Sequence, residues 1–204
     1  ANLSKWDVSN VVTMESMFEN CHVFNSDLRN WNTSKVSTMK SMFKDCHRFS
    51  SHIPYHKAKS SWDVSNVIDM SKMFYNCHEF STEIYNWKTS KVLDMSEMFY
   101  NAYKFDGLSF DIKIQCWDVS HVKNFNKMFY NASKFSGNLC TWHMSCTVDE
   151  YQVENMFSGS YYGVSRRAKN NWLPKYFPLS GITKLFFAIC CCIYFDTNVN
   201  PTIS

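Results

Sequence analysis

The sequence predicts an α/β repeat solenoid, a rod of about six units of about 25 residues, each a short strand plus a short helical or 3₁₀ turn. Three observations predict it. A tryptophan is followed by Met-Phe six times, after eleven residues in five copies and fourteen in the sixth. Other apolar residue types recur in register with this pair. No glycine-rich phosphate loop or HExxH motif competes with the repeat.

The predicted units are anchored by Trp6, Trp31, Trp62, Trp87, Trp117 and Trp142. Their Met-Phe pairs begin at Met17, Met42, Met73, Met98, Met128 and Met156. We assign residues 1–163 to the repeat and residues 164–204 to a C-terminal cap or a poorly ordered tail. One unit cannot bury its own apolar side chains, so we expect stacked units in which each column forms a ladder of like side chains.

Within each unit, the apolar spacing predicts the local structure. Val11, Met14, Met17 and Phe18 are separated by one, three or four positions, which is typical of a helical or 3₁₀ turn with one inward face. The segment from Phe24 to Trp31 is short, with apolar residues between polar ones, and predicts a brief strand. The polar stretch after Trp6, Trp62 and Trp117 carries Asp-Val-Ser, and we expect its carboxylate to cap turn amides (Asp7, Asp63 and Asp118).

Two spacings are longer than the rest. The distance from Trp31 to Trp62 is 31 residues, and that from Trp87 to Trp117 is 30. The extra residues, 52–61 and 107–116, fall at the same phase of the repeat. Insertions at one phase project from one side of a repeat rod, so both are candidate binding loops.

The repeat resembles a known family. Trp6-Asp7-Val8-Ser9-Asn10-Val11, followed by Met14, Met17-Phe18, Cys21 and Phe24, is similar to the BspA-like leucine-rich-repeat surface proteins. The resemblance covers roughly residues 1–160, and the chain departs from the pattern after Met156-Phe157. It implies a leucine-rich-repeat-like rod with a strand-lined face, located at the cell surface or outside the cell. It also implies surface attachment or protein binding, with no catalytic residues.

Composition excludes few functions. A net charge of +3 over 204 residues, with scattered Lys and Arg, does not predict a nucleic-acid partner. The chain begins at Ala1 in the middle of a repeat and contains no signal peptide, so we expect either removed upstream sequence or a fragment. The apolar run from Leu185 to Phe195 has eleven residues, whereas a bilayer-spanning helix needs about 20, so no transmembrane span is predicted. This run has three interpretations: a cap on the last repeat, an interfacial membrane segment, or sequence that is not natural coding sequence.

Cysteines and histidines recur as adjacent pairs. Cys21, Cys46 and Cys77 fall in one core column, which favours buried thiols, although the spacing between stacked units is also compatible with a disulfide. The histidine after each cysteine is expected to point outward and to stack in a row. Because adjacent side chains diverge, they do not converge as zinc ligands do. We predict no metal and no cofactor.

Tyr75, Tyr100 and Tyr130 share one column, two residues after the methionine of Met-Phe. This strip is either an exposed binding patch or a surface ladder that stiffens the stack. The sequence predicts a non-enzymatic repeat scaffold that binds a protein or a glycan through its strand-lined face or its two inserted loops. The alternative is a structural subunit of a larger assembly with no transient ligand. The oligomeric state is left open.

Overall fold

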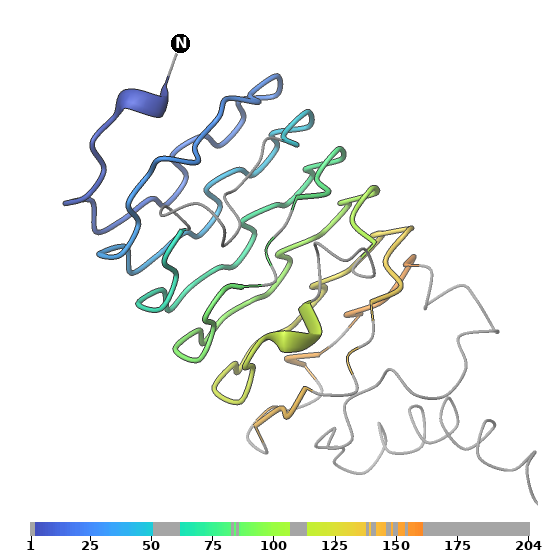
Figure 1. The fold of residues 1–204 in the computed structure, drawn as a ribbon. Coiled ribbons are helices and arrows are strands. Elements are labelled where there is room, and N and C mark those ends of the chain that lie inside the picture. The colour runs from blue at the N-terminus through green and yellow to red at the C-terminus, as the bar shows by residue number, and fades with distance from the viewer. Residues whose placement is uncertain are drawn as a thin grey trace, which may run out of the picture.

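The protein is described by a computed structural model covering residues 3–50, 62–82, 84, 86–106, 114–137, 139, 142–145, 148, 151–153 and 155–160. In this part the chain winds into successive coils that lie side by side in one row (Figure 1). We number the coils 1 to 6 in chain order by the tryptophan each contains, Trp6 to Trp142. The C-terminal segment 164–204 and most of the inserted residues 52–61 and 107–116 lie outside the described residues, so the predictions for them stay predictions.

The predicted α/β fold class is wrong. The described residues form no α-helix and no extended strand; their regular elements are two 3₁₀ helices, η1 (Leu3–Lys5) and η2 (Ile114–Cys116). Among the described residues, the strand-like pairing between neighbouring coils is a chain of isolated parallel bridges, from Thr13 through Thr38, Asp69 and Asp94 to Asn124. The segment from Phe24 to Trp31, predicted as a strand, is irregular instead, with a turn at residues 29–30. A leucine-rich-repeat-like rod with a strand-lined face is therefore also wrong.

The predicted helical segment is a series of tight turns. The N–H of Met17 bonds to the carbonyl of Met14, and the N–H of Cys21 bonds to that of Phe18, three residues back in each case. The third residues of these two turns are Ser16 and Asn20, with φ of 54° and 63°. A positive φ at that position is the signature of a type II turn and is incompatible with an α-helix. The same two positions have positive φ in every coil.

Backbone N–H groups that would bond within a helix instead form hydrogen bonds between coils. Alternate N–H groups of coil 1 bond to coil 2 rather than to their own coil. Met14, Ser16, Phe18 and Asn20 donate to the carbonyls of Thr38, Lys40, Met42 and Lys44 at 2.8–3.0 Å. The same set recurs between coils 2 and 3, 3 and 4, and 4 and 5. Because half of the N–H groups point along the row, only the other half can close turns within the coil.

The core is the interior of this row. Its apolar columns are fully buried from coil 2 to coil 5, including Met42, Met73, Met98 and Met128, which confirms the predicted ladders. The rings of Phe43, Phe74, Phe99 and Phe129 stack at 5.7–5.8 Å between centroids. Each also packs on the second phenylalanine of its own coil, for example Phe74 on Phe80 at 3.9 Å. Offset stacking of this kind adds to the stabilisation from area burial alone.

The tryptophans form a second ladder that is both apolar and hydrogen-bonded. Trp31 and Trp62 lie 6.4 Å apart at an interplanar angle of 9°. The indole Nε1 of Trp31 donates to the carbonyl of Leu3 at 2.9 Å, and that of Trp62 to the carbonyl of Leu28 at 3.1 Å. Each indole thus satisfies its buried donor on the preceding coil, as buried tryptophans require.

The polar turns after the tryptophans behave as predicted. The N–H of Ser65 donates to Asp63 Oδ1 at 2.9 Å, and equivalent bonds join Ser9 to Asp7 and Ser120 to Asp118 at 3.0 Å. Hydrogen bonds from these serines lower the pKa of each aspartate. The carboxylates therefore close local turns.

Candidate binding surface

The tyrosine column lies on the outside of coils 3, 4 and 5. Tyr75 and Tyr100 stack at 4.6 Å between ring centroids, and Tyr100 and Tyr130 at 4.7 Å, with interplanar angles of 12° and 6°. All three side chains are half-buried. Since Tyr100 has a ring on either side, the faces of the rings are turned to one another. The strip is therefore a ladder that offers ring edges and hydroxyl groups, which makes it a poor platform for stacking a sugar ring.

Burial and neighbouring groups favour the protonated hydroxyls of Tyr75 and Tyr100. Desolvation raises the pKa of Tyr75, and the adjacent Tyr100 and Glu97 raise it further. The pKa of Tyr100 is raised by desolvation first and then by Tyr130 and Glu97. A protonated phenol both donates and accepts hydrogen bonds. Tyr75 and Tyr100 thus offer neutral hydrogen-bonding groups at neutral pH.

In coils 1 and 2 the same column position holds charge instead of aromatic rings. Lys44 Nζ lies 2.5 Å from Glu19 Oε1 and 3.8 Å from Asp45 Oδ2. The hydrogen bond between Lys44 and Glu19 raises the pKa of Lys44 and lowers that of Glu19. The tyrosine strip therefore continues at its N-terminal side as a charged pair.

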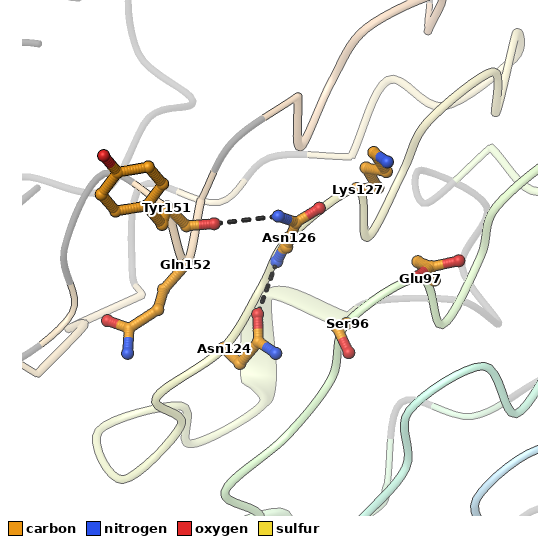
Figure 2. Close-up of a pocket in the computed structure, with 7 residues that line it drawn as sticks. All are labelled: Ser96, Glu97, Asn124, Asn126, Lys127, Tyr151 and Gln152. Carbon is orange, nitrogen blue, oxygen red and sulfur yellow. Dashed lines mark hydrogen bonds between the residues drawn. The ribbon is translucent and has the colours of Figure 1, made fainter.

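Next to the strip, coils 4 to 6 form an open pocket of about 450 Å³. It is lined by Ser96, Glu97, Asn124, Asn126, Lys127, Tyr151 and Gln152 (Figure 2). The backbone N–H of Asn126 donates to Asn124 Oδ1 at 3.0 Å, and its Nδ2 donates to the carbonyl of Tyr151 at 2.9 Å. Apart from the Tyr151 ring, which is 75% exposed, the lining is amide, hydroxyl and charged groups. Such a lining suits a polar ligand rich in hydroxyls or amides.

Sequence reasoning identified the tyrosines but not this pocket. Its lining residues come from three coils and lie at positions where the repeat varies, such as Asn124 and Asn126, which replace Asp94 and Ser96 of the preceding coil. The departure of the fifth coil from the common pattern, including Phe125 in the methionine column, was the available signal.

A row of asparagines beside the tyrosines was also missed. Asn76 Nδ2 donates to Asp45 Oδ1 at 2.5 Å, Asn101 Nδ2 to Asn76 Oδ1 at 2.7 Å, and Asn131 Nδ2 to Asn101 Oδ1 at 3.0 Å. In coil 6 the same position is Gly159, with φ 72°, where an added Cβ would lie 2.0 Å from Asn131 Oδ1. We define Asp45, Asn76, Asn101 and Asn131 as the amide ladder. Asparagine suits it because it tolerates positive φ and can both donate and accept.

The histidines stack as predicted. His22 and His47 lie 4.8 Å apart, His47 and His78 lie 4.6 Å apart, and Tyr103 extends the stack at 4.8 Å from His78. His22 Nδ1 lies 2.9 Å from the carbonyl oxygen of Asp45. An open pocket of about 510 Å³ beside the stack is lined by Asn25, His47, Arg48, Ser50, His78 and Glu79. Within the described part of the chain, no group of three His, Cys, Asp or Glu side chains could hold a metal ion.

Acid is expected to weaken the stack at His78. Desolvation lowers the pKa of His78 below its ordinary 6.5, and His47 lowers it further, while Glu79 and Asp45 oppose this shift. A lowered pKa in the folded state means that the neutral ring stabilises the fold above about pH 6.5 and that this contribution is lost as the pH falls through the folded pKa. His78→Phe keeps an aromatic ring in the stack and removes its charge. Between about pH 7.5 and pH 5, we expect the melting temperature of His78→Phe to fall less than that of the wild type. Equal slopes would contradict this account.

The cysteine column is partly as predicted. Cys46 and Cys77 are buried thiols that donate to the carbonyls of Phe18 and Phe43 at 3.0 Å, and burial raises the pKa of Cys46 to about 12. Cys21 was predicted to be buried, but it is exposed because no described residue covers coil 1 at this position. Cys116 is also an exposed thiol.

Comparison with known proteins identifies one family that matches this chain. No curated protein and no solved structure matches the chain. Among the described residues, there is no helix with both the length and the apolar character needed to cross a membrane. The family described as Mycoplasma protein of unknown function, DUF285, matches residues 1–61 and 54–172. These two matches cover most of the sequence, and the chain therefore belongs to the DUF285 family.

Proposed function

We propose that this protein is a non-enzymatic repeat scaffold that binds a protein or a glycan and serves in surface attachment. Its repeat resembles that of the BspA-like surface proteins, and we propose the same location, at the cell surface or outside the cell. The observation that carries this proposal is the row of tyrosine hydroxyls on coils 3 to 5, beside the polar pocket of coils 4 to 6. Glu97 connects the two features, since it lines the pocket and raises the pKa of Tyr75 and Tyr100.

The arrangement favours recognition by hydrogen bonds from a fixed surface. The rings are held by stacking and the amide ladder beside them is held by side-chain hydrogen bonds. Side chains that are ordered before binding lose less conformational entropy when a partner docks. A partner with regularly spaced hydroxyl, amide or carbonyl groups, such as a glycan or an extended protein segment, fits such a row.

Removing only the hydroxyls tests this proposal. The triple substitution Tyr75→Phe, Tyr100→Phe, Tyr130→Phe preserves the ring stack, so the melting temperature should stay close to that of the wild type. Binding of the full chain to immobilised glycans and to extracellular matrix proteins is measured on arrays. We expect affinity for the captured partner to fall at least about tenfold, because three hydrogen bonds of about 0.5–1.5 kcal/mol each are lost.

Tyr103→Phe is the matched control. Tyr103 is also a stacked tyrosine of coil 4, but it lies on the histidine stack. It should leave binding unchanged. Equal binding by the triple variant and the wild type would remove the tyrosine strip from the proposed site.

The alternative function is a structural subunit of a larger assembly without a transient ligand. One observation favours it: Ile68 and Leu93 share one column on the neighbouring coils 3 and 4 and are 48% and 41% exposed. Failure of the wild-type chain to bind any glycan or matrix protein, together with stable co-purification in a fixed ratio with other proteins of its source cell, would favour this alternative.

A further inference from the structure

An exposed aromatic ring lies at the polar pocket of coils 4 to 6. Tyr151 is 75% exposed, and no other ring of the described residues stacks on it. It differs in this from the tyrosine strip, whose ring faces are turned to one another. In the earlier coils the column of Tyr151 holds Val12, Ser37, Ile68, Leu93 and Lys123. The repeat therefore does not require an aromatic ring at this position.

The backbone that carries Tyr151 is fixed to coil 5. Asn126 Nδ2 donates to the carbonyl of Tyr151 at 2.9 Å, and the N–H of Phe125 donates to the carbonyl of Gln152 at 2.6 Å. These two bonds hold the base of the Tyr151 side chain at a defined place beside the amides of coil 5. Because this part of the backbone is ordered before a ligand arrives, less conformational entropy is lost on binding.

The amide groups next to the ring are also held in place. Figure 2 shows the side chains of Asn124 and Asn126 between the Tyr151 ring and Ser96. Asn124 Oδ1 accepts from the N–H of Asn126 at 3.0 Å, and Asn124 Nδ2 donates to Asp94 Oδ2 at 3.1 Å. Among the described residues, Ser96 Oγ and Asn126 Oδ1 have no hydrogen-bond partner. The hydroxyl is therefore free to donate and accept, and the amide oxygen is free to accept.

The charges that line the pocket balance. Glu97 contributes one carboxylate and Lys127 one ammonium group, so the lining has no net charge. Outside the lining, Lys72 Nζ lies 3.8 Å from Glu97 Oε1. The pocket volume of about 450 Å³ falls within the range of small-molecule sites, about 300–1,000 Å³. The lining therefore favours a small neutral group over a strongly charged one.

These features favour a sugar over a peptide. An extended peptide binds through free backbone groups of a protein edge, but the N–H groups of Ser96 and Asn126 already donate to the side chains of Asp94 and Asn124. Apart from the Tyr151 ring, the lining contains no apolar side chain that could receive a peptide anchor. A pyranose has hydroxyl groups around its rim and C–H groups on its faces. The rim matches the amides, and a face matches an exposed aromatic ring.

We propose that this pocket binds a neutral pyranose unit of a glycan, an inference that rests on the proposed binding function and narrows its partner to a carbohydrate. Tyr151 packs on a C–H face of the sugar, which removes apolar surface from water. Ser96 Oγ and Asn126 Oδ1 bond to hydroxyl groups of the sugar. Glu97 accepts and Lys127 donates hydrogen bonds at the edge away from the ring. The tyrosine strip beside the pocket contacts further units of the same glycan.

The test compares two substitutions at Tyr151 in the full chain. Binding of a panel of neutral trisaccharides, built from glucose, mannose, galactose or N-acetylglucosamine, is measured by NMR titration. For each sugar that the wild type binds, we expect Tyr151→Ser to raise the dissociation constant by about tenfold or more, because the aromatic contact is lost. Tyr151→Phe keeps the ring and should change the dissociation constant by less than about twofold. Since Tyr151 is exposed, both variants should melt at the wild-type temperature.

Tyr103→Ser is the matched control, because it removes another exposed tyrosine, on the histidine stack of coil 4. Sugar binding that is kept in Tyr103→Ser and Tyr151→Phe but weakened in Tyr151→Ser supports the proposal. Equal binding by Tyr151→Ser and the wild type would overturn it, and so would a wild-type chain that binds no sugar of the panel. If that chain still captures a matrix protein and loses it in the triple phenylalanine variant, the proposed function stands without the pyranose site.

Discussion

Phe99→Ala is expected to lower the free energy of unfolding by about 3–5 kcal/mol, the range for removing a fully buried phenylalanine. Phe99 is 0% exposed and has a ring on each side, Phe74 and Phe129, both at 5.7 Å. It also stacks on Phe105 of its own coil at 4.0 Å. Neither neighbouring coil can move in to fill the cavity, because both are fixed by backbone hydrogen bonds to coil 4. Urea unfolding followed by tryptophan fluorescence measures the loss.

The matched control is the same change in the same column at coil 1. Phe18 is 8% exposed and, among the described phenylalanines, stacks along the row on Phe43 alone, at 5.6 Å. Phe18→Ala should therefore cost roughly half as much as Phe99→Ala. Equal losses at both positions would mean that stacking along the row does not dominate the stability of the column.

The second large effect is expected in the amide ladder. Asn101 has φ 55°, donates to Asn76 and accepts from Asn131. Asn101→Leu places a branched side chain at positive φ, which costs about 1–2 kcal/mol, and removes two hydrogen bonds of about 0.5–1.5 kcal/mol each. We expect the free energy of unfolding to fall by roughly 2–5 kcal/mol, measured by urea unfolding.

Asn101→Gly separates the two contributions. Glycine adopts positive φ without steric cost, so only the side-chain hydrogen bonds are lost. The loss should be roughly half of that for Asn101→Leu. If leucine and glycine are equally destabilising, backbone conformation at this position does not contribute.

The burial pattern was predictable from sequence because it depends only on repetition. Met42, Met73 and Met98 recur at one phase of the repeat, and stacking copies of one unit forces them into the same environment. The row of histidines followed from the same logic. The prediction of burial was wrong at Cys21 and Trp6, because repetition does not indicate whether a coil lies on both sides of a given unit.

The local structure was not predictable from apolar spacing. A separation of three or four residues places Met14, Met17 and Phe18 on one side of a helix, but also on one side of consecutive type II turns. What decides between them is where alternate N–H groups find acceptors, and these acceptors lie in the next coil. Asn20 and its equivalents carried a usable signal, since asparagine recurring at a fixed position often marks positive φ.

Only part of the candidate surface was predictable from the sequence. The tyrosine strip is a column and was visible in the sequence. The pocket beside it was not, because Asn124, Lys127 and Tyr151 come together through differences between coils rather than through what the coils share. A repeat pattern predicts the structure that all coils share. It does not predict a pocket whose lining residues differ from one coil to the next.

Uniform junctions also bear on how such a protein changes over generations. Recombination that deletes in frame the segment between two equivalent positions, such as Met42 and Met73, would rejoin edges that already carry matching donors and acceptors. Duplication of a segment would do the same. A single genetic event can thus change the number of coils without any compensating substitution. Variants of different length are therefore expected to arise readily.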